Sequence, residues 1–242
     1  MISVIIPTLN AEETLPDTLA ALIPAAVEGL VREVIVADGG SSDATARIAD
    51  QAGVEYIQCP AGRGQQLAAA AARARFPWLL MLHADTVLAE GWVREAGAFV
   101  RSVEEGRRSA SAAVFRFKLD DLGMKPRILE ALVRLRCLVF RLPYGDQGLL
   151  VPRQLYLDAG GFKPIPIMED VDLVRRIGRR RIVLLETAAL TSAERYRRDG
   201  YVKRSLRNQL CLWLYFLGLP AGRIATLYPG RQRTGRAGAA ER

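Results

Sequence analysis

This sequence of 242 residues has few cysteines, no long apolar run and no recognisable secretory signal. Its three cysteines, Cys59, Cys137 and Cys211, are far apart and odd in number, which argues against a disulfide framework and for a reducing compartment. No run approaches the ~18 apolar residues of a membrane-spanning helix, and the first residues show no signal peptide. We therefore expect a cytoplasmic protein.

Basic residues are in excess, with a formal net charge of +8, and the excess is concentrated in one stretch. Between Arg175 and Arg207 there are 11 lysines and arginines against three acids. Such a block is either a solvated basic face or a site for nucleic acid, phosphate ligands or an anionic membrane surface. No helix-turn-helix, zinc-finger or ribonucleoprotein signature accompanies it, so we expect no nucleic-acid partner.

The first half of the chain alternates short apolar runs with helical stretches, which predicts an α/β fold. Strands are predicted at 2–6, 33–37, 54–58 and 78–82, with helices at 11–27, 43–52 and 64–74 between them. Continuously apolar strands alternating with helices indicate a mostly parallel sheet covered on both faces. Ligands bind such sheets at the carboxyl ends of the strands, so the residues that follow each strand matter most.

The second half is less regular. Helices are predicted at 90–103, 128–142, 169–180 and 203–218, and strands at 112–118 and 147–151. Arg127, just before the helix at 128–142, and Arg134 and Arg141 within it recur every seven residues along one side. Residues 229–242 are rich in glycine and arginine, which is typical of a disordered basic tail.

Carboxylates follow two of the predicted strands. Asp38 lies in a glycine-rich turn, where it either accepts hydrogen bonds from a base or ribose or belongs to an ordinary strand–helix turn. Asp85 follows a buried strand and is placed to hold Mg²⁺ or Mn²⁺, which prefer oxygen ligands and bridge diphosphates. His83, the only histidine, lies two residues earlier and on the same side of an extended segment, so it is either structural or a second ligand.

Glu169 and Asp170 open the predicted helix at 169–180. Carboxylates are stabilised near a helix N-terminus, which is a purely structural interpretation. The functional interpretation makes one of the pair the base that deprotonates an acceptor hydroxyl.

Four segments, in this order and spacing, resemble the family-two glycosyltransferases. They are residues 1–10, the turn at Asp38, the His-Ala-Asp segment 83–85, and Glu169-Asp170. The resemblance is closer to a subgroup of small bacterial enzymes that are found with selenodomain and radical-enzyme proteins and are linked to arsenosugar biosynthesis. The stretches 81–86, 144–147 and 167–171 carry that narrower resemblance.

The resemblance implies a GT-A fold, a Rossmann-like sheet with helices on both faces, in one domain over residues 1–228. Residues 1–105 would bind the nucleotide-sugar and residues 106–228 the acceptor, leaving 229–242 as the tail. It also implies an inverting, metal-dependent transfer of a hexosyl-type sugar from a UDP-sugar. The acceptor would be a hydroxyl or carboxyl of a small molecule or a lipid, and the metal Mn²⁺ or Mg²⁺.

The same resemblance implies roles for single residues. Asp170 would be the base, with Glu169 as its supporting neighbour. Asp85 and His83 would hold the metal, although His83 stands where the family has an acid. Gly39 likewise replaces the second acid of the pair that begins at Asp38. The residues implied to contact the donor are Pro7, Glu12, Asp38, Arg63 and Asp85. Separately, a basic side chain of the stretch 195–198, with Arg195 as the candidate, would close over the phosphates.

Two other functions are open at this point. A nucleotidyltransferase would need a glycine-rich phosphate loop after the first strand, where this chain has Pro7-Thr8-Leu9-Asn10. A non-catalytic sugar-nucleotide binder or membrane-surface protein would explain the missing acids at Gly39 and His83.

The predicted helix at 203–218 carries an apolar stripe that allows two interpretations. It consists of Leu206, Leu210, Trp213, Leu214 and Leu217, with basic residues at its start. The stripe either packs on the domain or across a homodimer seam, or lies in the interface of an anionic membrane. The second interpretation would place the protein at the inner face of the membrane.

Overall fold

The computed structural model describes residues 1–227 and contains one eight-stranded sheet over that range. The predicted tail at 229–242 lies outside the described residues. The strand order is β3-β2-β1-β4-β7-β6-β8-β5. The predicted α/β fold with a mostly parallel sheet is confirmed, because the first four strands are parallel and β6 is parallel to β8. The antiparallel strand β7 joins these two parts.

The first four strands lie where the sequence predicted them. They are β1 (Ile2–Thr8), β2 (Val31–Asp38), β3 (Glu55–Gln58) and β4 (Trp78–Met81). Their residues alternate between two cores: Val4 and Ile6 point into one, while Ile5 points into the other. Both faces of β1 and β4 are therefore buried, which explains why these two strands are almost entirely apolar, whereas β3 at the edge of the sheet carries the polar Glu55 and Gln58.

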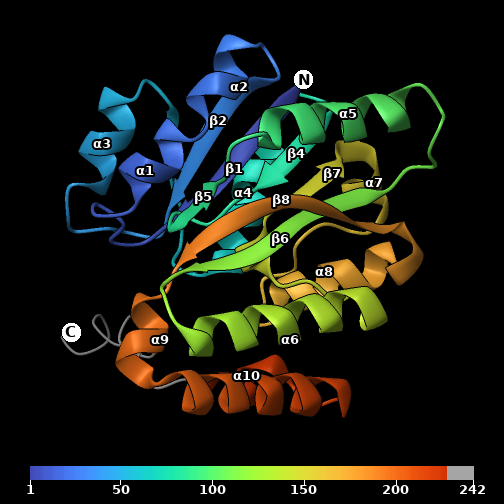
Figure 1. The fold of residues 1–242 in the computed structure, drawn as a ribbon. Helices are drawn as coiled ribbons and strands as arrows, with labels where there is room; N and C mark the ends of the chain where they lie inside the picture. The colour runs from blue at the N-terminus through green and yellow to red at the C-terminus, as the bar shows by residue number, and fades with distance from the viewer. Residues whose placement is uncertain (228–242) are drawn as a thin grey trace, which may run out of the picture.

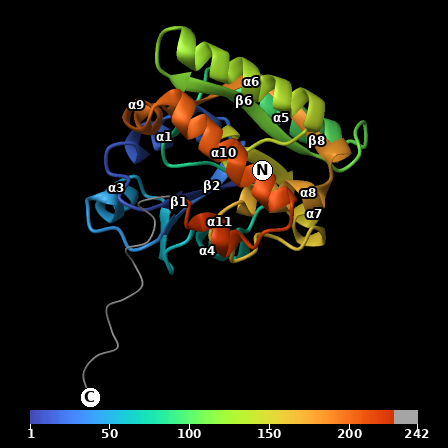
Figure 2. The same ribbon diagram turned by 90° about the horizontal axis from the view of Figure 1, so that it is seen from below.

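Helices cover the two faces of the sheet (Figures 1 and 2). One face is covered by α1 (Leu15–Ala20), α2 (Ile23–Val27), α3 (Thr45–Gln51) and α5 (Trp92–Glu104). The other is covered by α4 (Arg63–Arg73), α7 (Arg153–Asp158) and α8 (Glu169–Ile177). The single helix predicted at 11–27 is wrong, because the chain forms two short helices there. Each has a proline in its first turn, Pro16 and Pro24, a position that suits a residue without an N–H.

The second half completes the sheet and adds an outer layer of helices. The strands are β5 (Thr86–Leu88), β6 (Ala112–Asp120), β7 (Leu149–Pro152) and β8 (Ile182–Ser192). The outer helices are α6 (Met124–Phe140), α9 (Glu194–Asp199), α10 (Tyr201–Phe216) and α11 (Ala221–Ala225). The sequence did not predict β5, β8, α7, α9 or α11. No helix within residues 1–227 is long and apolar enough to cross a membrane.

Candidate active site

Asp38, the last residue of β2, is fully buried and connects the carboxyl ends of β1 and β2 through hydrogen bonds. One of its oxygens accepts hydrogen bonds from the Thr8 hydroxyl (2.8 Å) and the Ser41 hydroxyl (2.5 Å), and the other from the N–H groups of Gly40 (2.9 Å) and Ser41 (2.7 Å). Burial opposes ionisation, but these hydrogen bonds outweigh it and hold the pKa of Asp38 below its usual value. Asp38 therefore shapes the turn, and its contact with a nucleotide stays a prediction.

The loops after β1 and β2 are fastened to each other by reciprocal hydrogen bonds. The Glu12 carboxylate accepts from the Ala44 N–H at 2.9 Å, while the Glu12 N–H donates to Asp43 at 3.0 Å. Asn10, with a φ of 51°, accepts from the Ser42 N–H at 2.9 Å. Pro7 lies within β1, opposite Ala37 of β2. Glu12 and Pro7 thus belong to the rim predicted to receive the donor, and the Glu12 carboxylate is used to hold that rim together.

Two features near this rim were not expected from the sequence. The buried Gln66 of α4 donates to the carbonyls of Thr8 (2.7 Å) and Ala37 (2.8 Å), which locks α4 to β1 and β2. A Cβ at Gly39 would lie 3.2 Å from the Ala61 backbone and 3.2 Å from Gln66. The second acid of the family's pair would therefore have little room at position 39.

Arg63, at the start of α4, reaches across to the start of α8. Its guanidinium pairs with the Glu169 carboxylate and lies 3.4 Å from Asp170 and 3.0 Å from His83 Nε2. Gly64 makes this approach possible, because a Cβ there would lie only 2.6 Å from the Lys163 carbonyl oxygen. The sequence predicted Arg63 on the nucleotide side; the structure places it among the acids, and a phosphate contact stays a prediction.

Glu169 and Asp170 differ in exposure. Glu169 is fully buried, and one of its oxygens has no hydrogen-bond partner among the described residues. The Asp170 side chain is 15% exposed and accepts hydrogen bonds from the N–H groups of Gly145 (2.6 Å) and Val171 (2.8 Å). A substrate can therefore reach Asp170, while Glu169 holds Arg63 in place.

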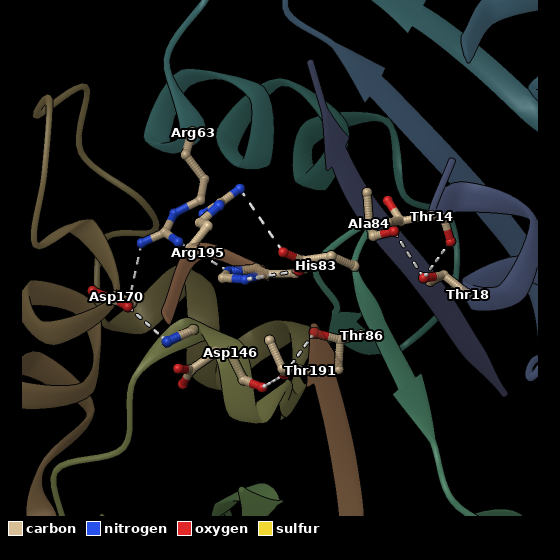
Figure 3. A network of polar contacts seen from close by, with 12 residues as sticks. Thr14, Thr18, Arg63, His83, Ala84, Thr86, Asp146, Asp170, Thr191 and Arg195 are labelled. Carbon is tan, nitrogen blue, oxygen red and sulfur yellow. Dashed lines mark hydrogen bonds and ion pairs between the residues drawn. The ribbon is translucent and has the colours of Figure 1, made fainter. Parts of the chain in front are cut away.

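Asp85 faces His83 and an arginine from a distant part of the chain. His83 Nδ1 lies 3.9 Å from one Asp85 oxygen, and the Arg195 guanidinium lies 3.8 Å from the other. Arg195 is in α9, directly after β8, and the Ser192 N–H at the end of β8 donates to the Asp85 carbonyl. Figure 3 shows Arg63, His83, Asp170 and Arg195 converging from separate elements.

The residues present fit a divalent cation that arrives with a diphosphate. Over residues 1–227 no group of three or more histidine, cysteine, aspartate or glutamate side chains could hold a metal alone. Asp85 and His83 supply two groups at most. Mg²⁺ is commonly held by one or two carboxylates together with substrate phosphates and water, which is what this pair allows.

Asp146 is a further acid in the site, which the sequence indicated only through the Gly-Asp-Gln stretch 145–147. It is half-buried, and one of its oxygens has no hydrogen-bond partner among the described residues. Burial raises the pKa of Asp146 to about 6; the nearby Asp170 carboxylate acts in the same direction and Arg136 against it. The site thus holds a second carboxyl that gains a proton readily.

Comparison with known proteins bears on the family and the fold of the chain. Residues 3–162 match the sequence profile described as Glycosyl transferase family 2. Among solved structures, TarS 1–349 from S. aureus has a TM-score of 0.60 and 16% identity, over 93% of this chain and 68% of TarS 1–349. Glucosyl-3-phosphoglycerate synthase from Mycobacterium tuberculosis was solved in complex with Mn²⁺, UDP-glucose and phosphoglyceric acid. It has a TM-score of 0.59 and 21% identity, over 91% of this chain and 80% of the synthase chain. These likenesses confirm the predicted GT-A fold, and no curated protein matches the sequence.

Proposed function

The chain belongs to glycosyl transferase family 2, and we propose that it transfers a sugar, with inversion, from a UDP-sugar to an acceptor hydroxyl or carboxyl. One observation carries this proposal: two acids, a histidine and two arginines lie together at the carboxyl edge of the sheet. They are Asp85, Asp170, His83, Arg63 and Arg195. UDP is favoured because TarS was solved with UDP and the synthase with UDP-glucose.

The proposed chemistry divides the site between the leaving group and the acceptor. A Mn²⁺ or Mg²⁺ ion held by Asp85 and His83 would supply positive charge to the diphosphate. Arg195, which is 63% exposed, is free to turn from Asp85 towards the phosphates. Asp170 accepts the acceptor's proton, and the Gly145 N–H and Arg63 fix its orientation.

Asp170→Asn tests the proposal, since it removes the base and keeps the shape of the side chain. We expect loss of about 10²–10⁴-fold in turnover, the usual contribution of a general base, with donor affinity near that of the wild type. UDP release would be measured with a panel of UDP-sugars and candidate acceptors. Asp50→Asn, on an exposed position of α3, is the matched control. Near-normal turnover of Asp170→Asn would move the role of base to Asp146 or Glu169.

Three finer statements belong to the same proposal. We propose one catalytic domain over residues 1–228, with the donor half at 1–105 and the acceptor half at 106–228. We also propose that the chain belongs to the small bacterial subgroup linked to arsenosugar biosynthesis. The amino-acid sequences of the stretches 81–86, 144–147 and 167–171 support this. The acceptor is a small molecule or a lipid.

A non-catalytic sugar-nucleotide binder is the second candidate. It is favoured by His83 in place of a metal-binding acid and by the packing that leaves little room for an acid at Gly39. The same assay separates the two functions, because a binder would show donor affinity without UDP release. A nucleotidyltransferase would instead release inorganic diphosphate.

A further inference from the structure

Helix α6 exposes an apolar face to solvent. Six apolar side chains on one side of the helix are between 49% and 76% exposed: Met124, Ile128, Leu132, Leu135, Leu138 and Val139. Phe140, at the end of the helix, is exposed as well. On the opposite side, Val133 and Cys137 are buried against β6. The helix is thus apolar on both sides, and only one side has a partner among the described residues.

Helix α10 repeats this arrangement. Val202, Leu206, Leu210, Trp213 and Leu217 follow the same spacing as residues 124, 128, 132, 135 and 139, and they are 52–74% exposed. Of the stripe predicted from the sequence only Leu214 packs on the domain, and the other four side chains are exposed, because Cys211 and Leu212 on another side make the buried contacts. The two helices begin next to each other, where the Tyr201 hydroxyl donates to Asp121, and lie on the same side of the molecule (Figures 1 and 2). We call these eleven side chains the apolar face.

A cavity of about 720 Å³ at the end of α6 is lined by arginines. Arg108, Arg141, Arg179 and Arg180 line it together with Ile182, Val183 and Leu184 at the start of β8. No acid lines it, and none of the four guanidiniums makes an ion pair within residues 1–227. Charge of one sign in a hollow attracts anions. The Asp85 site lies at the other end of the 11-residue strand β8, roughly 30 Å away, so the cavity is separate from it.

We propose that the apolar face docks on an anionic lipid bilayer, with the arginine cavity receiving lipid phosphate groups. Amphipathic helices lie in a bilayer interface with their apolar sides inserted and basic groups at the rim. A second copy of the chain is a poorer occupant. A second copy would have to offer acids to Arg179 and Arg180 at one end of the face, but Asp121 and Asp199 at the other end are already paired with Arg197 and Arg198.

Docking would also bring the catalytic site near the membrane. The N-terminal ends of α6 and α10 adjoin α9, which carries Arg195 (Figure 1). A lipid acceptor could then approach from the bilayer. This last step rests on the proposed glycosyl transfer, whereas the docking itself does not.

Vesicle co-sedimentation of the full chain tests the docking. The probes are phosphatidylcholine vesicles with and without phosphatidylglycerol, at low and high salt. We expect binding only to the anionic vesicles, weakened by salt. Two double variants should each bind at least about tenfold more weakly than the wild type. They are Leu132→Glu/Leu135→Glu and Arg179→Glu/Arg180→Glu. The controls, Val27→Glu on α2 and Arg47→Glu on α3, should bind like the wild type.

Three results would overturn the proposal. The first is protein that stays in the supernatant with anionic vesicles at low salt. The second is equal binding of all variants, which would place the contact elsewhere in the chain. The third is a lipid-free dimer, seen by sedimentation velocity, that the Leu132→Glu/Leu135→Glu variant dissociates. Circular dichroism checks folding, and UDP release without lipid should match the wild type in these variants, which separates a failure of docking from a failure of the proposed transfer.

Discussion

The carboxylates of the site differ in their surroundings, and we assign them different tasks on that ground. Asp38 accepts hydrogen bonds from its own turn and from Thr8, Glu169 is buried against Arg63, and Asp170 is partly exposed. The Asp85 carboxylate contacts two side chains, both at long range: Arg195 at 3.8 Å and His83 at 3.9 Å. Of these four acids, Asp85 has the loosest surroundings, and it is the one we assign to a metal that arrives with the substrate.

Asp85→Ala should abolish the effect of metal on nucleotide binding, since no group of three or more ligating side chains within residues 1–227 could hold the ion without the substrate. In titration calorimetry the wild type should bind UDP more tightly with Mn²⁺ than without it, and the variant equally in both conditions. His83→Ala should have a smaller effect, because water can replace one neutral ligand. Asp50→Ala serves as the control. The assignment fails if Asp85→Ala keeps both the affinity and the metal response of the wild type.

Asp146 should make stability depend on pH in a direction opposite to that of a paired carboxylate. Its pKa is raised to about 6 from 3.8, so the folded state holds the proton more tightly than the unfolded state does. Between these two values stability falls as pH rises, and the cost of the buried charge is complete above about pH 6.

Asp146→Asn removes that cost. The variant should gain stability relative to the wild type as pH rises from about 4 to about 7, by about 1–3 kcal/mol. Urea unfolding with a chelator present measures it, and Asp50→Asn should show no such trend. A difference between wild type and Asp146→Asn that is the same at both pH values would contradict the raised pKa.

Among the elements, the contact between α4 and the start of α8 matters most for the site. It joins Arg63 to Glu169 and Asp170, residues more than a hundred positions apart. The close approach depends on Gly64, which faces the backbone of the 163–165 segment. The two elements cannot move apart without changing the position of Arg63.

Gly64→Ala should destabilise the protein by about 1–3 kcal/mol, because the added methyl meets a backbone carbonyl that cannot turn away. Chemical denaturation measures this, and turnover should fall with it. Gly97→Ala in α5 is the matched control: its nearest neighbour is the flexible end of Arg101, at 3.4 Å, and alanine favours the helix. Equal stability of the two variants would show that the contact is not tight.

Prediction from sequence succeeded for some elements and failed for others for physical reasons. Strands β1 and β4 are buried on both faces and therefore appear in the sequence as apolar runs, whereas β8 is only partly buried and follows three arginines. Asp85 and Asp170 could be selected as candidates because one directly precedes β5 and the other lies in the first turn of α8, and their roles stay predictions. The pairing of Arg63 with Glu169 could not, because it depends on tertiary contact. Helix α6 is apolar on two sides, so its sequence does not show which side faces solvent.

At the scale of the whole molecule, one basic block of the sequence serves two separate places. Arg179 and Arg180 line the cavity at the start of β8, and Arg195 reaches Asp85 just beyond its end. The strand between them carries the chain across the molecule (Figure 1). A count of charges along the sequence could not separate these two sites.

The order of strands in the sheet also bears on how the protein is made. Strand β4 pairs with β1 on one side and with β7 on the other, and β7 begins at Leu149, well after β4 ends at Met81. A ribosome adding about 5–20 residues per second therefore leaves one edge of β4 unpaired for several seconds. The nascent chain meanwhile presents an apolar, unpaired strand edge, the feature through which partly synthesised proteins stick to one another. Translation speed between residues 81 and 149, and not only the finished fold, should govern how much of this protein reaches its native state.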